Sequence, residues 1–304
     1  MLGFFLFDIY GSAKRHRQVV DNQVSFAILF QWLSVADKLM DFLLYLGLGA
    51  IAGLISGLFG VGGGVVIVPI LIFAFDAQGM SADVSTHMAI GTSLATILFT
   101  SMTSIYTHHQ RAAVRWDLVF RLSPGIVAGS ILGGLFALSV GGVFLQLVFG
   151  GFLVLIALQM LFYKPVEQLR GGPSTVILAL AGTAIGGLSS LLGIGGGALT
   201  APLLTFFGVR IHHAVGSAAA VGFPIALAAS LLYSSANSPA ASLPAYTLGY
   251  IFLPAWFGII LLSTPCARLG ALLAHRLDGL VLKKLFALLL FLLGVRFIWA
   301  NLVY

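Results

Sequence analysis

Long apolar runs, separated by short polar or glycine-rich segments, make up most of this chain from about residue 42 onward. A run of about 20 apolar residues is long enough to cross the hydrocarbon core of a bilayer as an α-helix, and most of the runs reach that length. The pattern therefore predicts an all-α polytopic membrane protein. The hydrophobic units span about 42–75, 87–106, 118–138, 143–162, 174–207, 214–233, 246–262 and 285–302.

Two of the units are interrupted by the same glycine pattern, G-x-G-G-G-x4-P. One copy runs from residue 60 to Pro69 and the other from residue 193 to Pro202. A phosphate-binding P-loop would continue with Lys-Ser or Lys-Thr, which follows neither copy. Asp83 lies at the distance that a dinucleotide site would require, but the surrounding run is uniformly apolar and forms no βαβ pattern. We therefore interpret both copies as breaks in membrane helices.

The order of the units repeats between the two halves of the chain. His87 and Gly91 match His212 and Gly216 in the units that follow the breaks. Duplication of one four-unit module explains this match, whereas a short-period solenoid does not. The predicted parts are a leader at 1–41, a first transmembrane repeat at 42–163, a cytoplasmic linker at 164–173 and a second transmembrane repeat at 174–304.

Composition excludes a soluble globular domain. Apolar residues make up 60% of the chain and charged residues 8%, with a mean hydropathy of +1.08, whereas soluble domains carry about 25% charged residues. The formal net charge of +6 belongs to the loops of a membrane protein, so we expect no nucleic-acid partner. The single cysteine, Cys266, excludes an intrachain disulfide.

The leader has two interpretations. Lys14, Arg15 and Arg17 precede a short apolar run at 24–36, a pattern typical of a secretory signal peptide. The same run also suits an interfacial helix that lies ahead of the first span. The sequence leaves both interpretations open.

The basic loops indicate how the two halves are oriented. If each broken unit returns to the side from which it entered, as a hairpin or paired half-helices, the basic segments at 111–115, 164–170 and 268–284 all lie on the cytoplasmic face. Each half then crosses an odd number of times, which makes the halves inverted copies. We therefore predict two inverted-topology repeats, each with a broken first unit plus three spanning helices, in the cell (inner or cytoplasmic) membrane. Residue 42 then lies outside, so the basic leader must be cleaved or must cross the membrane.

Symmetric breaks in an inverted repeat are typical of transporters that bind their substrate near the midplane of the bilayer. A helix that begins directly after each break presents unpaired N–H groups and the positive end of its dipole, and both favour an anion. The alternative is that the glycines only let helices cross closely. The predicted substrate-binding glycines are Gly62, Gly63, Gly64, Gly195, Gly196 and Gly197.

The residues around both breaks also carry a family signature. The segments G-L-I-S-G-L-F-G-V-G-G-G at 53–64 and L-S-S-L-L-G-I-G-G-G at 188–197, with A-I-G-T-S at 89–93 and V-R-W-D at 114–117, resemble the TauE/SafE family of sulfite-exporter-like permeases. The resemblance extends over roughly residues 42–304. It implies movement of sulfur-containing anions, such as sulfite or organosulfonates, across the cytoplasmic membrane.

Three positions in the second half depart from the repeat, and they weaken the expectation of a symmetric site. Ser190 stands where the first half has Gly57, and Ile259 and Ser263 stand where it has Gly129 and Gly133.

Side chains near the breaks supply further candidates for the binding site. Thr92, Ser93 and Ser217 could donate hydroxyl protons to a sulfonate oxygen, although hydroxyls in membrane helices also bond to neighbouring helices. Arg121 and Arg296 lie just inside apolar runs, where they could balance the charge of the substrate or extend to the headgroups.

Two histidines are the candidates for proton coupling. His87 and His212 match across the repeat and could titrate near neutral pH, although interfacial histidines would show the same pattern. The carboxylates lie in the leader, in loops or at the ends of spans, so we expect no buried carboxylate proton relay.

These observations together predict a secondary transporter for a small anion. A passive anion channel is the main alternative, because the spans carry no coupling carboxylate. A membrane enzyme would need a nucleophile with a positioned base or a metal cluster, and the pairs His108–His109 and His212–His213 lack co-ligands at metal-site spacing. We therefore expect no enzyme activity, no metal and no cofactor. The expected partners are the anion and the lipid bilayer, with a homodimer left open.

Overall fold

The computed structural model describes residues 39–40, 42–56, 58, 63–162, 174–236, 243–274 and 279–303. The chain divides into two compact units, Met1–Leu44 and Tyr45–Tyr304, and the second unit contains the helices from Gly64 to Val303. The predicted linker at 164–173, most of the predicted leader and Gly62 of the first break lie outside the described residues.

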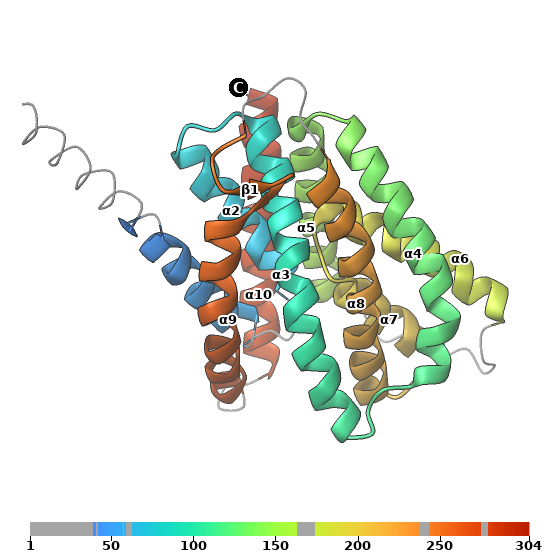
Figure 1. Ribbon diagram of the computed structural model, residues 1–304. Helices are drawn as coiled ribbons and strands as arrows, with labels where there is room; N and C mark the ends of the chain where they lie inside the picture. The colour runs from blue at the N-terminus through green and yellow to red at the C-terminus, as the bar shows by residue number, and fades with distance from the viewer. Residues whose placement is uncertain are drawn as a thin grey trace, which may run out of the picture. The chain divides into compact units, whose positions relative to one another are not determined.

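The described part of the chain is almost entirely helical (Figure 1). Within it, seven helices are long and apolar enough to cross a membrane, which confirms the predicted all-α polytopic membrane protein. The helices are Phe42–Ser56, α2 (Gly64–Ala77), α3 (Ala82–Gln110), α4 (Trp116–Ser139), α5 (Gly142–Phe162), α6 (Thr175–Leu192), α7 (Gly197–Phe206), α8 (Ile211–Ser235), α9 (Leu253–Ala274) and α10 (Gly279–Val303).

Both glycine breaks interrupt the helices where the sequence predicts. Helix α2 begins at Gly64, and α7 begins at Gly197 after α6 has ended at Leu192. Helix α2 has 14 residues and α7 has 10, so at 1.5 Å per residue they are about 21 Å and 15 Å long. Both are shorter than the hydrocarbon core, which is about 30 Å thick. The two helices after the breaks are therefore too short to cross the membrane by themselves.

The segment before α9 differs from the prediction. A small antiparallel hairpin, β1 (Thr247–Leu248) and β2 (Ile251–Phe252), occupies the start of the unit predicted at 246–262. Tyr246 and Gly249 take left-handed backbone conformations there, with φ of 66° and 55°, which turn the chain sharply. Helix α9 then begins at Leu253 and continues to Ala274, well beyond the predicted end.

The first helix of each broken unit packs against a helix of the other half. Helix α6 lies beside α4 (Figure 1), where a Cβ atom added at Gly125, Gly129 or Gly133 would meet the backbone of α6. In the same way, Gly53 of the helix Phe42–Ser56 packs against the backbone of Ser263 on α9. Small residues thus bring both pairs of helices to backbone contact, as is common in membranes.

Other helices contact their repeat counterparts directly. Helix α3 packs against α8, and α5 packs against α10. In the second pair, a Cβ at Gly150 would lie 2.9 Å from the carbonyl oxygen of Gly294. These reciprocal contacts are what a duplicated module would produce, and the inverted orientation of the two repeats stays a prediction.

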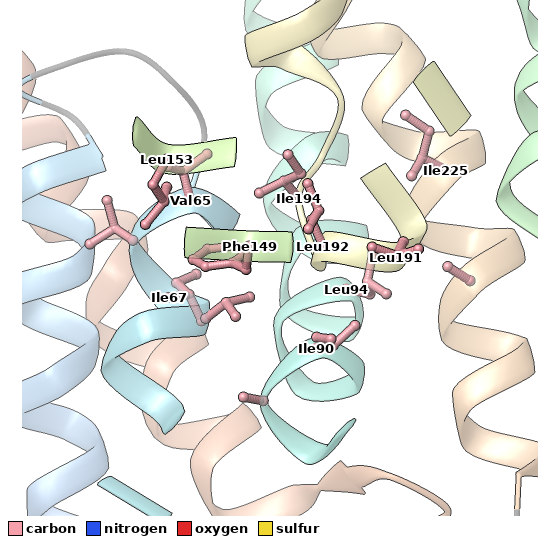
Figure 2. Packing of buried hydrophobic residues seen from close by; sticks show 14 of the residues in the cluster. Val65, Ile67, Ile90, Leu94, Phe149, Leu153, Leu191, Leu192, Ile194 and Ile225 are labelled. Atoms are coloured by element: carbon pink, nitrogen blue, oxygen red, sulfur yellow. The ribbon is translucent and has the colours of Figure 1, made fainter. Parts of the chain in front are cut away.

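The breaks are embedded in the hydrophobic core. Figure 2 shows Leu192 and Ile194, which flank Gly193 of the second break, in the same part of the core as Ile90 of α3. A Cβ atom at Gly193 would lie 3.1 Å from the Cα atom of Ile90 and 2.8 Å from a methyl group of Val68 on α2. Helices α2 and α3 therefore enclose the second break.

The contact between α4 and α6 predicts that replacing one of its glycines by alanine lowers the stability of the folded protein. We expect Gly129→Ala to destabilise the folded protein by about 1–3 kcal/mol, because its methyl group would overlap the carbonyl group of Thr183 and push the helices apart. The measurement is thermal unfolding in detergent. Gly151→Ala on α5 is the control, because a Cβ atom there meets nothing within 4 Å. Equal melting of the two variants would contradict this account.

Candidate functional site

The two glycine breaks meet in the structure. A Cβ atom on Gly64, the first residue of α2, would lie 2.5 Å from the carbonyl oxygen of Gly193 and 2.8 Å from the Cα atom of Ile194. The start of α2 therefore rests directly on the segment that joins α6 to α7, and only glycine fits at this contact.

The second break depends on two left-handed glycines. Gly193 ends α6 with φ of 71°, and Gly196 precedes α7 with φ of 70°. The N–H group of Ile194 donates to the carbonyl oxygen of Ser189 at 2.9 Å, which closes the end of α6 in the manner of a helix-terminating Schellman motif. These turns let α7 restart within a few residues of the end of α6.

Helices α2 and α7 both begin without a side-chain cap. Gly63 and Gly196 stand at the N-cap positions and offer no side-chain acceptor, whereas Ser81 caps α3 and Ser174 caps α6. Within the described residues, the first backbone bonds to Gly63 and Gly196 come from the N–H groups of the third and fourth residues that follow each glycine. The preceding N–H groups in each helix are thus left for another acceptor, at the positive end of the helix dipole.

Two adjoining cavities lie at the breaks, with volumes of about 370 Å³ and 490 Å³. The first is bounded by the helix Phe42–Ser56, α3 and α9, and the second by α3, α7 and α8. Gly63 lines both cavities, while Gly195 and Gly197 line the second. Both breaks therefore border one two-lobed hollow. The lining residues that the two lobes share are Ser56, Gly63, Thr100, Ser104, His108 and Ala267.

The described residues that line this hollow are compatible with a negatively charged ligand. His108 is the one ionisable side chain among the described residues that line either lobe, and those residues include no carboxylate. The remaining lining consists of hydroxyl groups, glycines and small apolar side chains. Fixed negative charge, which would repel an anion in a medium of low dielectric constant, is absent from this described lining.

The three hydroxyl residues predicted as ligands bond to the protein itself. The Ser93 hydroxyl donates to the carbonyl oxygen of Gly193 at 2.8 Å, and Thr92 Oγ1 accepts from the Phe252 N–H group at 3.0 Å. Ser217 Oγ accepts from the Arg115 N–H group at 2.9 Å. Among the described residues these bonds hold the second break, the hairpin and the α3–α4 loop, and direct contact of these hydroxyls with substrate stays a prediction.

The two arginines predicted as charge partners lie away from the two lobes. Arg121 on α4 is exposed, and so is Arg296 on α10, whose guanidinium lies 5.9 Å from the ring centroid of Phe73. Neither residue lines the hollow. These positions fit the alternative in which long cationic side chains extend toward the headgroups.

The two matched histidines have different surroundings. His87 is only 5% exposed, and its ring nitrogens lie 2.6 Å from the carbonyl oxygen of Asp83 and 3.0 Å from that of Ala137. His212 is exposed beside His213. The buried ring of His87 links α3 to α4, whereas the exposed ring of His212 makes no corresponding link between described helices. Proton coupling by either residue stays a prediction.

The sequence pattern missed the polar face of α3. Thr100, Ser104 and His108 stand four residues apart and all line the hollow, as expected for one face of an α-helix. The predicted unit ended at residue 106, because the polar residues that follow resemble a loop, but α3 continues to Gln110. The regular spacing of hydroxyls in this segment was the available signal.

The loop after α3 carries a fixed ion pair. Arg115 donates two hydrogen bonds to the Asp117 carboxylate, at 2.8 Å and 2.7 Å. These bonds raise the pKa of the Arg115 guanidinium, so the residue stays charged at any physiological pH. Both side chains are largely exposed, so the pair adds little to stability.

The fold and the hollow at its breaks define a polytopic membrane protein with a cavity of the size of a small-molecule site. The family model described as "Sulfite exporter TauE/SafE" matches residues 45–297, and the chain belongs to this family. No solved structure matches the chain.

Curated relatives carry names that agree with this family. A "Probable membrane transporter protein" of Haemophilus influenzae is 35% identical over 257 residues, which cover 84% of this chain and 97% of that protein. YunE of Bacillus subtilis, with the same description, is 27% identical over 86% of this chain and 98% of its own length. A relative from Methanocaldococcus jannaschii is 29% identical over 70% of this chain and 80% of its own. The protein is therefore a multi-pass membrane transporter and not an enzyme.

The bond between Ser93 and Gly193 yields a stability prediction. We expect Ser93→Ala to destabilise the protein by about 1–3 kcal/mol, because the buried carbonyl group of Gly193 loses its side-chain donor. Thermal unfolding in detergent measures the loss. Ser139→Ala is the control, since that exposed hydroxyl bonds only within its own helix. An unchanged melting temperature for Ser93→Ala would show that the bond does not hold the break.

Proposed function

We propose that the protein is a secondary transporter that moves a small sulfur-containing anion, sulfite or an organosulfonate, across the cytoplasmic membrane. The observation that carries this proposal is the shared hollow: Gly63 of the first break and Gly195 and Gly197 of the second all line it. The description of the family, sulfite exporter, supports the choice of a sulfur oxyanion.

The binding chemistry follows from the helix ends. The N–H groups that precede the first backbone bonds of α2 and α7 need acceptors, and the oxygen atoms of a sulfonate supply them. Each helix N-terminus adds about 0.3–1 kcal/mol of electrostatic attraction, and up to about 2 kcal/mol where it is partly buried. The lack of a carboxylate among the described lining residues leaves this attraction unopposed.

The size of the hollow supports a small substrate. The two lobes have volumes of about 370 Å³ and 490 Å³, and small-molecule sites generally lie between about 300 Å³ and 1,000 Å³. The lobes share lining residues and therefore overlap, so the volume of the whole hollow is less than the sum of the two lobe volumes. Inorganic sulfite and short organosulfonates fit within this range.

The packing of the halves suggests how transport proceeds. Helix α6 of the second half packs on α4 of the first, and the helix Phe42–Ser56 of the first half packs on α9 of the second. In an inverted repeat, rocking of one bundle against the other would open a midplane site to each face in turn. The glycine contacts between halves supply smooth backbone surfaces for such movement.

The test of the site enlarges one glycine of each break. Among the described residues, the atoms nearest to a Cβ at Gly63 belong to the Ile67 side chain, at 2.9 Å, and those nearest to a Cβ at Gly195 belong to the Ile97 side chain, at 3.0 Å, so the closest contacts are with flexible side chains and not with the backbone. We expect Gly63→Val and Gly195→Val to fold and to lose at least about 10-fold in affinity for sulfite and methanesulfonate, because the new groups fill the hollow. Affinity is measured from the thermal stabilisation that each anion gives relative to chloride.

Gly151→Val on the open face of α5 is the matched control for these two variants. Gly196 is a poor choice, because its left-handed backbone would strain with any side chain. If both site variants keep the stabilisation by anions and the uptake into vesicles that the control shows, the anion binds elsewhere.

A passive anion channel is the second candidate, favoured by the lack of a carboxylate among the described lining residues. Flux through reconstituted vesicles separates the two. For a carrier we expect unlabelled anion on the far side to accelerate uptake of labelled sulfite. The binding site must return to the near side after each transfer, and it can return with unlabelled anion bound. Uptake that rises linearly with concentration, follows the imposed voltage and ignores anion on the far side would establish the channel.

A further inference from the structure

The hydroxyl groups around the hollow fall into two sets. The first set donates to carbonyl oxygens of its own helix, three or four residues earlier, which is how membrane helices commonly satisfy serine and threonine. Such a hydroxyl has used its only proton and has none left to donate to a ligand. The bonded lining residues are Thr100, Ser101, Thr103 and Thr107 on α3 and Thr264 on α9.

The second set consists of three serines that make no such bond. Ser56 ends the helix Phe42–Ser56, Ser104 lies on α3 and Ser263 on α9, and all three line the smaller lobe. Within the described residues, the buried Ser263 hydroxyl has no hydrogen-bond partner, and the half-buried Ser56 and Ser104 make no bond to a carbonyl oxygen of their own helix. Ser263 is only 5% exposed, and a buried hydroxyl without a partner is unfavourable in the empty protein.

Ser263 differs from its counterpart in the first half of the repeat. Its counterpart in the first half is Gly133, which packs against Gly187 and leaves no space for a hydroxyl. The larger lobe is instead walled on α8 by Val215, Ala218 and other small residues. Among the described residues that line the hollow, the hydroxyls without a partner therefore lie on one side, between the helix Phe42–Ser56, α3 and α9, whereas the buried unpartnered hydroxyls of Ser189, Ser190 and Thr200 line neither lobe.

We propose that Ser56, Ser104 and Ser263 are the side-chain ligands of the transported anion, and that its oxygen atoms bind on the side of the first break. This inference rests on the proposed function. Three hydroxyls from three helices match the three oxygen atoms of a sulfite or sulfonate group, and each hydroxyl proton is free to rotate about its Cβ–Oγ bond. The bound anion supplies the acceptor that each serine lacks, while the amide groups at the start of α2 contact the same oxygen atoms.

The experiment removes one hydroxyl at a time. Ser56→Ala, Ser104→Ala and Ser263→Ala are purified in detergent and melted with sulfite, methanesulfonate or chloride at equal ionic strength. Without anion we expect melting temperatures equal to or above that of the wild type, because each change deletes an unpartnered hydroxyl. We expect the affinity for both sulfur anions to fall by about 10-fold to 100-fold per serine, the range for a hydrogen bond to a charged group.

Ser190→Ala is the matched control. Ser190 is also fully buried and unpartnered within the described residues, but it lies beside Gly134 and lines neither lobe. We expect this variant to keep the affinity of the wild type. Equal losses in Ser190→Ala and in the three lining variants would overturn the proposal, because the effect would then belong to the fold.

The outcomes separate this inference from the function on which it rests. If the anions stabilise the wild type and all three lining variants equally, the serines are not ligands, while the proposed function stands. If neither anion stabilises the wild type or enters vesicles that contain it, the proposed function fails and the assignment of ligands fails with it. Should one variant not fold, the other two serines, on separate helices, carry the test.

Discussion

Backbone polar groups inside a bilayer must find partners within the protein, and this constraint governs both glycine breaks. At the second break, the carbonyl oxygen of Gly193 accepts from the Ser93 hydroxyl, and the N–H group of Ile194 donates to Ser189. Gly64 then packs on this satisfied segment from α2. The unwound backbone is thus tolerated because α3 supplies a donor and the other break covers it.

The same constraint explains why the breaks are suited to binding. Within the described residues, the first N–H groups of α2 and α7 have no backbone acceptor, and Gly63 and Gly196 carry no capping side chain. Gly63 and Gly197, at the starts of these helices, line the hollow. An acceptor that arrives from outside completes the hydrogen bonding, so the requirement that shapes the fold also favours an anionic ligand.

Local patterns predicted the spans and the breaks, because the length of an apolar run and a cluster of glycines are properties of short segments. The hairpin at Thr247–Phe252 was missed, since each strand has only two residues and its turn at Gly249–Tyr250 is marked by a single glycine in a chain that has 37. The hydroxyl roles were harder still. Whether Ser93 or Ser104 has a proton to donate depends on which helix lies opposite, and that is decided by tertiary packing.

Duplication and divergence have different consequences in this structure. The glycines of the two matched breaks set the breaks against each other, because Gly64 rests on Gly193, so the repeat builds the frame of the hollow. A perfectly symmetric frame would offer an anion two equivalent positions. Ser263 in place of a glycine adds a buried hydroxyl to the lining on one side, whereas Ser190, which replaces Gly57, lines neither lobe. In the proposed site, the preference for one binding position therefore comes from a residue that the repeat does not match, because only such a residue distinguishes the two sides.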